Sequence, residues 1–229
     1  MTLGFGNVYK FKSGSTVFHR YIVSDFTGVL LLCVLFNGNL CLNHRISQLH
    51  LWITAINTKL NTSSSKIYGV YDLIIVTTIP VIPTLKDAWL SGFTDAEGCF
   101  NINITQRNKT YTGFRIMLRF LLDQKNAIEI LSHIRNLFGF GAVILRKDTK
   151  EVYRYYCDSF IGLKNIILYF QAFPLKTIKA SAFNHWLKAY KMVENKEHLT
   201  KQGLTIIRDI KKQINVTNEK ASKIGSAKP

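Results

Sequence analysis

The chain has 229 residues, 47% of them hydrophobic and 12% aromatic, which suffices for one large or two small domains with apolar cores. Thirty Lys and Arg side chains stand against 14 Asp and Glu, a formal net charge of +16 that favours a polyanionic partner such as nucleic acid. The four cysteines lie far apart without a CxxC pair, which excludes a zinc site of the usual spacing. The strongest apolar run, residues 29–36, is too short to cross a bilayer, so we expect no membrane span.

The N-terminal part predicts a β-hairpin followed by two helices. Residues 7–12 and 16–23 have strand character and flank a Ser-Gly-Ser turn. Residues 28–36 and 44–60 carry apolar side chains at helical spacing. A polar run then begins, and we expect residues 61–83 to form a linker.

The chain repeats itself. Residues 20–52 align without a gap on residues 154–186, at a constant offset of 134. Upstream, Gly4-Phe5-Gly6 matches Gly139-Phe140-Gly141 at an offset of 135. The second copy has residues 84–138 ahead of the repeated part, whereas the first copy has no counterpart of them. The identical pairs in the longer match are Arg20/Arg154, Tyr21/Tyr155, Phe26/Phe160, Gly28/Gly162, Phe36/Phe170, Ser47/Ser181 and Trp52/Trp186.

The additional part of the second copy predicts a helix that begins at Thr84, which can cap the first turn after Pro83. Asp95 and Glu97 lie at its C-terminal end, where the helix dipole disfavours carboxylates. A bound cation would offset this repulsion, and the alternative is a solvated acidic helix end closed by Gly98. Small residues along the helix predict a face that another helix approaches closely, namely Ala88, Ser91, Gly92 and Ala96.

The segment Leu90–Gly98 (LSGFTDAEG) resembles the nine-residue signature of the LAGLIDADG homing endonucleases. Residues 99–107 and 114–125 resemble the first two strands of that family. The resemblance covers residues 84–216 as one complete unit and residues 1–60 as the latter half of another. It implies an α+β fold, αββαββα, with an antiparallel saddle-shaped sheet that binds the DNA major groove, preceded by a partial ββαα copy.

The resemblance also implies a metal site. In this family the last acidic residue of the signature helix holds Mg²⁺ at the scissile phosphate, and that residue is Glu97 here. Asp95 is the second candidate ligand. Divalent ions supply a hydroxide nucleophile and stabilise the charges of phosphodiester hydrolysis, so the protein needs mainly to place carboxylates correctly.

Further catalytic candidates follow from the same resemblance. Gln124 matches a glutamine that orients water in the family, with a surface amide as the alternative. The family has a basic residue at the start of the helix after the second hairpin, but the register places Ile178 there. This departure leaves two neighbouring candidates, Lys176 and Lys179.

Alternation along the predicted strands places apolar side chains on one face and polar ones on the other. Asn and Arg side chains read base edges, while Lys and Arg also contact phosphates, although a polar sheet face is usually only solvated. The candidate DNA-binding residues are Asn101, Asn103, Thr105, Arg107, Arg115, Arg119, Arg146, Lys147 and Arg154. Residues 217–229 have the composition of a disordered tail.

The sequence therefore predicts a site-specific, Mg²⁺-dependent DNA endonuclease for intron homing, encoded in a mitochondrion or a chloroplast. Cleavage of both strands of a long double-stranded target needs two signature acids, and the chain shows Glu97 alone. The chain would act as a monomer with two units or as a dimer through the signature helix. The alternative function is an RNA maturase or a non-cleaving nucleic-acid-binding protein that assists splicing of the intron RNA.

Overall fold

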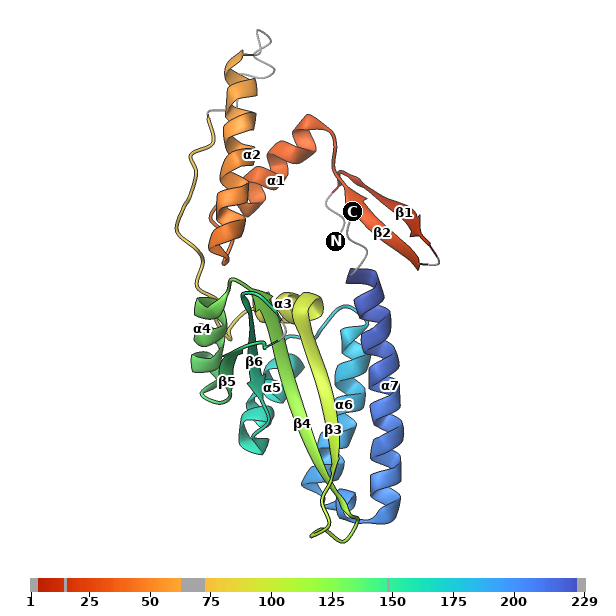
Figure 1. Cartoon of the computed structure of the whole chain (residues 1–229). Helices are drawn as coiled ribbons and strands as arrows, with labels where there is room; N and C mark the ends of the chain where they lie inside the picture. Colours follow the sequence, from red (N-terminus) through yellow and green to blue (C-terminus); the bar gives the residue numbers. More distant parts are fainter. Residues whose placement is uncertain (1–3, 15, 63–72, 148, 226–229) are drawn as a thin grey trace. The chain divides into compact units, whose positions relative to one another are not determined.

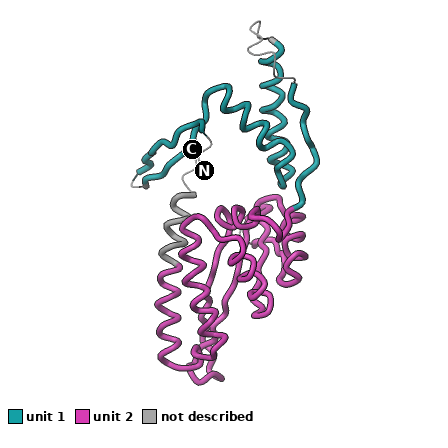
Figure 2. Tube along the Cα trace, turned by 180° about the vertical axis from the view of Figure 1, so that it is seen from behind, with its two compact units in different colours: residues 1–82 teal, residues 83–229 magenta. Residues whose placement is uncertain are grey.

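A computed structural model describes residues 4–14, 16–62, 73–147 and 149–225. The chain divides into two compact units, Met1–Ile82 and Pro83–Pro229 (Figure 2). Each unit is described by itself. Within the described residues, no helix is both long and apolar enough to cross a membrane.

The first unit is a hairpin followed by two helices, as predicted. Its elements are β1 (Asn7–Ser13), β2 (Thr16–Ile22), α1 (Phe26–Phe36) and α2 (Asn43–Thr62) (Figure 1). The two strands pair antiparallel. The helices bury a small apolar core made of Leu30, Cys33, Leu49, Ile53 and Ile56.

The segment after α2, which we expected to be a linker, is in part held against the first unit. Residues 61–62 belong to α2, and residues 63–72 lie outside the described part. Further on, the Asn57 side chain donates to the Ile74 carbonyl at 2.9 Å and accepts from the Ile74 amide at 3.0 Å. Ile74 and Val76 pack on the core of the unit. Burial of these apolar side chains explains why residues 73–82 follow the helices.

The second unit has the predicted order αββαββα, extended by further helices. The first seven elements are α3 (Trp89–Glu97), β3 (Gly98–Gln106), β4 (Phe114–Lys125), α4 (Ile128–Phe138), β5 (Ala142–Leu145), β6 (Val152–Cys157) and α5 (Phe160–Ala172). The remaining ones are α6 (Lys179–Glu194), the 3₁₀ turn η1 (Glu197–Leu199) and α7 (Lys201–Gly225). The strands form one antiparallel sheet in the order β3-β4-β6-β5, which confirms the fold class.

Two predicted boundaries were wrong. The signature helix begins at Trp89 and not at Thr84, because the Thr84 hydroxyl bonds Asp87 at 2.7 Å and so closes a local turn. Asp87 in turn accepts a hydrogen bond from the Trp89 amide at 2.8 Å. At the other end, α7 continues through Gly225, since Glu, Lys and Ala residues sustain a helix. The expected disordered tail is therefore helical as far as the structure describes it.

Helices cover one face of the sheet, and an aromatic cluster joins the two layers. Phe100 on β3 is fully buried, and its ring centroid lies 5.6 Å from that of Phe170 on α5 and 5.5 Å from that of Trp186 on α6. The Trp186 indole also donates to the Asn101 carbonyl at 3.2 Å. Figure 1 shows α5 and α6 behind β3 and β4, with the opposite face of the sheet uncovered.

The internal repeat is visible in the structure. Gly6 and Gly141 have φ angles of +73° and +90°, which glycine adopts at no steric cost. The hydroxyl of Tyr21 donates to the Phe5 carbonyl, and that of Tyr155 donates to the Phe140 carbonyl. These equivalent contacts confirm that the hairpin and the two helices of each unit are copies of one motif. The two units also share a helix cap, in which Asp25 bonds the Gly28 amide and Ser159 bonds the Gly162 amide.

We expect Phe100→Ala to lower the free energy of unfolding of the second unit by about 3–5 kcal/mol, because it empties the centre of the aromatic cluster. Tyr111→Ala, at an exposed tyrosine in the β3–β4 turn, should change it by about 0.5 kcal/mol or less. Urea unfolding followed by circular dichroism compares the two variants. Equal losses would contradict the role given to Phe100.

Candidate active site and nucleic-acid interface

The signature helix turns directly into the first strand of the sheet. Glu97 is the last residue of α3 and is solvent-exposed, and Gly98 is the first residue of β3. The Gly98 amide closes the helix by donating to the Thr94 carbonyl. A Cβ atom at Gly98 would lie 2.7 Å from that carbonyl oxygen, so only glycine permits so sharp a turn. The turn leaves the Glu97 carboxylate at the edge of the sheet.

Asp95 is engaged in structural hydrogen bonds. Its carboxylate accepts from the amides of Lys176 at 2.8 Å and Thr177 at 3.2 Å, and from the Thr177 hydroxyl at 2.6 Å. These contacts hold the loop before α6 against the end of α3. We therefore reassign Asp95 from second metal ligand to anchor of this loop, since both of its oxygens are used there.

The two candidate lysines differ in their surroundings. Lys179, the first residue of α6, is buried, and its ammonium group donates to the Gly98 carbonyl. Burial raises the pKa of the neighbouring Cys99 thiol, and the positive charge of Lys179 partly offsets this rise. Lys176 has an exposed side chain in the loop that Asp95 holds. Lys179 thus braces the turn after Glu97, while Lys176 extends into solvent.

Gln124 lies at the same end of the sheet as Glu97. The first residue of β3, Gly98, pairs with Leu122, so Gln124 stands two residues beyond the start of β3. Its neighbour across the sheet is Tyr153, and its side chain is partly exposed. The register therefore brings Gln124 to the end of α3, in agreement with its predicted location.

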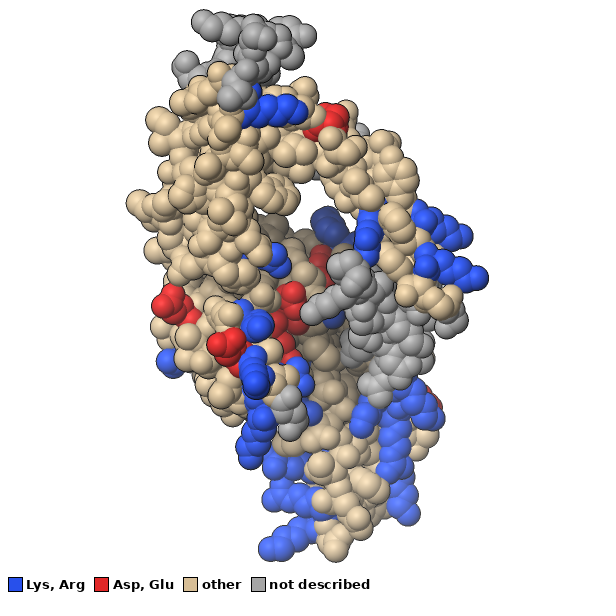
Figure 3. Space-filling view, turned by 45° about the horizontal axis from the view of Figure 1, so that its top comes forward, with Lys and Arg blue, Asp and Glu red and all other residues tan. Residues whose placement is uncertain are grey.

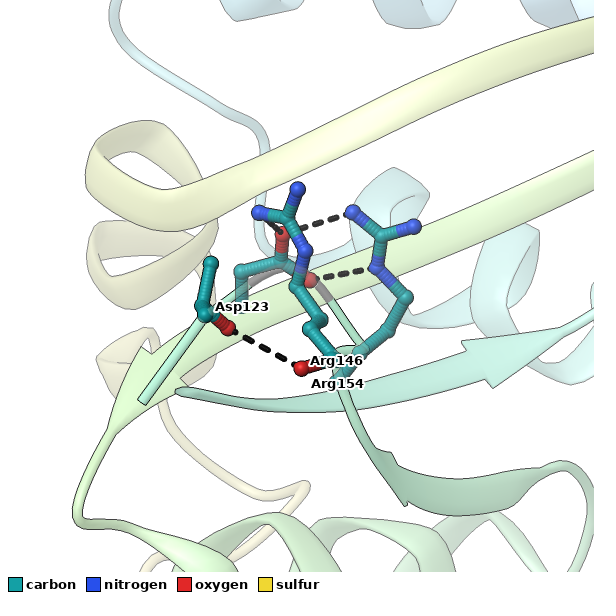
Figure 4. Close-up of polar contacts among 4 residues, drawn as sticks. Asp123, Arg146 and Arg154 are labelled. Carbon is teal, nitrogen blue, oxygen red and sulfur yellow. Dashed lines mark hydrogen bonds and ion pairs between the residues drawn. The ribbon is translucent and has the colours of Figure 1, made fainter. Parts of the chain in front are cut away.

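The sequence analysis missed Asp123, which organises two of the predicted DNA-binding arginines (Figure 4). Arg154 donates to both oxygens of Asp123, at 2.6 and 2.7 Å, and Arg146 donates at 2.9 Å. The hydrogen bond with Asp123 raises the pKa of Arg154 further. Asp123 pairs with Arg154 across β4 and β6, so only the strand register reveals their contact. One carboxylate thus holds two guanidinium groups on the uncovered face of the sheet.

A second polar pair lies on the same face. Arg119 donates from Nε at 3.1 Å and from Nη2 at 2.7 Å to the side-chain oxygen of Asn101, which stands opposite it in the β3–β4 register. Thr105 and Arg115 also stand opposite each other, and both are exposed. The predicted polar face is therefore present on β3, β4 and β6.

The remaining predicted DNA-binding residues are spread around this face. Asn103 lies on β3 between Asn101 and Thr105. Arg107 and Lys147 follow the ends of β3 and β5 and are exposed. Figure 3 shows Lys and Arg outnumbering Asp and Glu on the surface in view. A polyanion would meet many positive charges, which favours electrostatic attraction.

The predicted helix-packing face is smaller than expected. Ala88, Gly92 and Ala96 are exposed and recur every four residues, so they share one side of the helix. Ser91 instead faces the interior of its own unit, where its amide bonds the Tyr169 hydroxyl at 3.1 Å and its hydroxyl bonds the Phe173 carbonyl. The expectation for Ser91 was wrong, because its polar groups are satisfied by α5.

Comparison with known proteins was made for the sequence and for the fold. Residues 90–190 match the family described as LAGLIDADG endonuclease. The crystal structure of the homing endonuclease I-TnaI is 31% identical, with a TM-score of 0.53, and the match covers 61% of this chain and 99% of that one. The chain belongs to the LAGLIDADG endonuclease family. A longer relative is the "Probable intron-encoded endonuclease 4" of Neurospora crassa, 34% identical over 213 residues.

The LAGLIDADG match extends over both units. The alignment with the Neurospora crassa protein covers 93% of this chain, which spans 36% of the length of that relative. The LAGLIDADG meganuclease I-AabMI, whose crystal structure is bound to uncleaved DNA, is 22% identical with a TM-score of 0.72. That match covers 90% of this chain and 80% of I-AabMI and shows the shared fold.

Removing the Asp95 carboxylate tests its role as an anchor. We expect Asp95→Ala to lower the free energy of unfolding of the second unit by about 1–3 kcal/mol, because two loop amides lose a charged acceptor. Glu97→Ala, two residues away and exposed, should change it by about 0.5 kcal/mol or less. Thermal and urea unfolding of both variants checks this. A larger loss for Glu97→Ala would refute the assignment.

Proposed function

We propose that this chain is a site-specific, divalent-metal-dependent DNA endonuclease of the intron-homing type, with Glu97 as its metal-binding carboxylate. The observation that carries the proposal is the position of Glu97. An exposed carboxylate ends the signature helix beside an uncovered sheet face that bears arginine and asparagine side chains. This arrangement suits hydrolysis of a phosphate that belongs to a duplex lying along the sheet.

The residues present fit a magnesium ion shared with the substrate. Mg²⁺ takes oxygen ligands and often uses one or two carboxylates together with water and substrate phosphates. Among the described residues, no group of three or more His, Cys, Asp or Glu side chains could hold a metal without a substrate. Glu97 would therefore hold the ion together with the scissile phosphate. When bound, the ion supplies a hydroxide nucleophile and stabilises the developing charge.

Neighbouring residues of the chain position these groups. Gln124, at the same end of the sheet, would orient the attacking water through its amide. Lys176 would contact a nonbridging phosphate oxygen, since its ammonium group is in solvent and its loop is held by Asp95. Lys179 keeps Gly98 in place and so fixes the direction of Glu97.

The uncovered face of the sheet would bind double-stranded DNA in the major groove. Arg and Asn side chains form bidentate contacts with base edges there. Arg115 is free of the sheet interior and exposed, whereas Arg119 would exchange Asn101 for a base. The many lysines would add phosphate contacts that depend on salt.

Cleavage of both strands would need a second signature acid beside Glu97, contributed by another unit or another copy of the chain. An organellar location, mitochondrial or chloroplast, stays a prediction. Binding of the chain to its intron RNA with no binding to duplex DNA would favour the splicing function over cleavage.

Replacement of one carboxylate tests the chemistry. We expect Glu97→Gln to slow Mg²⁺-dependent nicking by at least about 100-fold, since a metal ligand accounts for several kcal/mol of transition-state stabilisation. Glu129→Gln, an equal loss of charge at an exposed position on α4, should leave the rate unchanged. The substrate is a supercoiled plasmid with the intron-free junction of the encoding gene. Equal nicking by both variants would remove Glu97 from the mechanism.

The salt dependence of binding tests the sheet face. We expect Arg115→Gln to weaken duplex binding and to reduce the slope of log K against log salt concentration by about 0.9, the value for one phosphate contact. The matched control is Arg135→Gln, an exposed arginine on α4 outside the sheet. Fluorescence anisotropy at several salt concentrations measures both. If the control shifts the slope as much as Arg115→Gln, the sheet does not hold the duplex.

A further inference from the structure

The first unit exposes aromatic and aliphatic side chains whose repeat equivalents in the second unit are buried. Trp52 on α2 is 54% exposed, whereas Trp186 on α6 is fully buried. Phe36 on α1 is 39% exposed, whereas Phe170 on α5 is 2% exposed. Because each pair is identical in type and in place, the difference lies in what covers them.

The pattern extends beyond the two identical pairs. Leu35 is 48% exposed and its equivalent Tyr169 is 5% exposed. Tyr21 is 46% exposed although its hydroxyl makes the same contact as that of the fully buried Tyr155. The exposed side chains of the first unit therefore follow the buried positions of the second unit rather than a random surface pattern.

In the second unit, these positions are covered by the segment that the first unit lacks. Phe170 and Trp186 pack on Phe100 of β3, and Phe170 also packs on Phe120 of β4 at 5.6 Å between ring centroids. The Tyr169 hydroxyl contacts the Ser91 amide of α3. Helix α3 and strands β3 and β4 thus form the cover.

The uncovered face of the first unit includes a groove. It has a volume of about 680 Å³ and lies between the end of β2 and the two helices. Trp52, Val29 and Leu32 are among its apolar lining residues. An apolar groove beside a row of exposed aromatic side chains has the character of an interface.

We propose that this face of the first unit binds a helix followed by two antiparallel strands, homologous to residues 89–125 and carried in cis on the same polypeptide. The cover of the second unit is continuous in sequence with the helices that it buries, which favours a covalently joined cover for the first. The Neurospora crassa relative and I-AabMI both contain length that this chain does not span. The proposal does not depend on cleavage activity.

The structure also specifies what the bound segment must offer. The first strand needs an apolar side chain at the place of Phe100, and its next backbone carbonyl should accept the Trp52 indole N–H, as Asn101 does for Trp186. Leu35 has no hydroxyl to match that of Tyr169, so the helix should present an apolar or small residue where α3 has Ser91. The cover is therefore similar to α3–β3–β4 but not interchangeable at every position.

The internal repeat gives the design of the test. Because Gly139 is equivalent to Gly4, a second copy of residues 84–138 can be placed directly ahead of Gly4 in the full chain without a linker. Because Ser91 would face Leu35, the added copy carries Ser91→Ala. A matched control adds the same segment with Phe100→Ser and Phe120→Ser in the added copy only. Hydroxyl-radical footprinting read by mass spectrometry then reports the solvent access of single side chains.

We expect oxidation of Trp52 and Phe36 to fall several-fold in the extended chain, toward the rates of Trp186 and Phe170. It should stay at the parent rate in the control. Leu51, which is exposed at 72% and whose equivalent His185 is only partly buried, should keep its rate in all three proteins. Unchanged oxidation of Trp52 in the extended chain, or equal protection in the control, would overturn the proposal.

The parent chain provides a test that needs no added segment. We expect Trp52 and Phe36 to react as exposed residues at every protein concentration. Protection in the monomer would show that the second unit of the same chain covers this face. Protection that increases with concentration would show that a second copy does. Either result would replace the proposed occupant.

Discussion

The site depends on two contacts that join the end of the signature helix to the start of α6, about eighty residues later in the chain. Asp95 accepts the amides of Lys176 and Thr177, and Lys179 donates to the Gly98 carbonyl. The partners carry opposite charges and bind backbone groups, so the contacts fix main chain rather than flexible side chains. Charge-assisted hydrogen bonds of this kind are stronger than neutral ones. Glu97 lies between Asp95 and Gly98, and its backbone is held on both sides.

This arrangement explains how neighbouring charged residues acquire different functions. Asp95 and Glu97 are two residues apart, but the helix directs the first toward the loop before α6 and leaves the second exposed. Lys179 is buried against the backbone while Lys176 is in solvent. A buried charge must be paired or hydrogen-bonded, and the backbone partners meet that requirement. The exposed member of each pair is then available for a metal ion or a phosphate.

The sequence predicted the elements well where local pattern determines them. Alternation identified the inward side of β3, and Phe100 and Ile102 are indeed buried. The contacts of Asp123 and Ser91 escaped prediction for a physical reason. Asp123 meets Arg154 only through the register of β4 with β6, and Ser91 turns inward because Tyr169 and Phe173 offer it hydrogen-bond partners. Such long-range pairings depend on the packed structure and leave no signal in a single sequence.

The two units show how burial depends on the whole fold and not on the residue itself. Trp52 and Trp186 occupy equivalent places on equivalent helices, yet one is half exposed and the other fully buried. The same contrast applies to the hairpins, since β2 has one neighbouring strand whereas β6 lies between β5 and β4. A sheet edge and an apolar helix face left uncovered together favour association with another chain segment. The signature helix is therefore important beyond its acid, because the segment that it begins also supplies the apolar cover of its own unit.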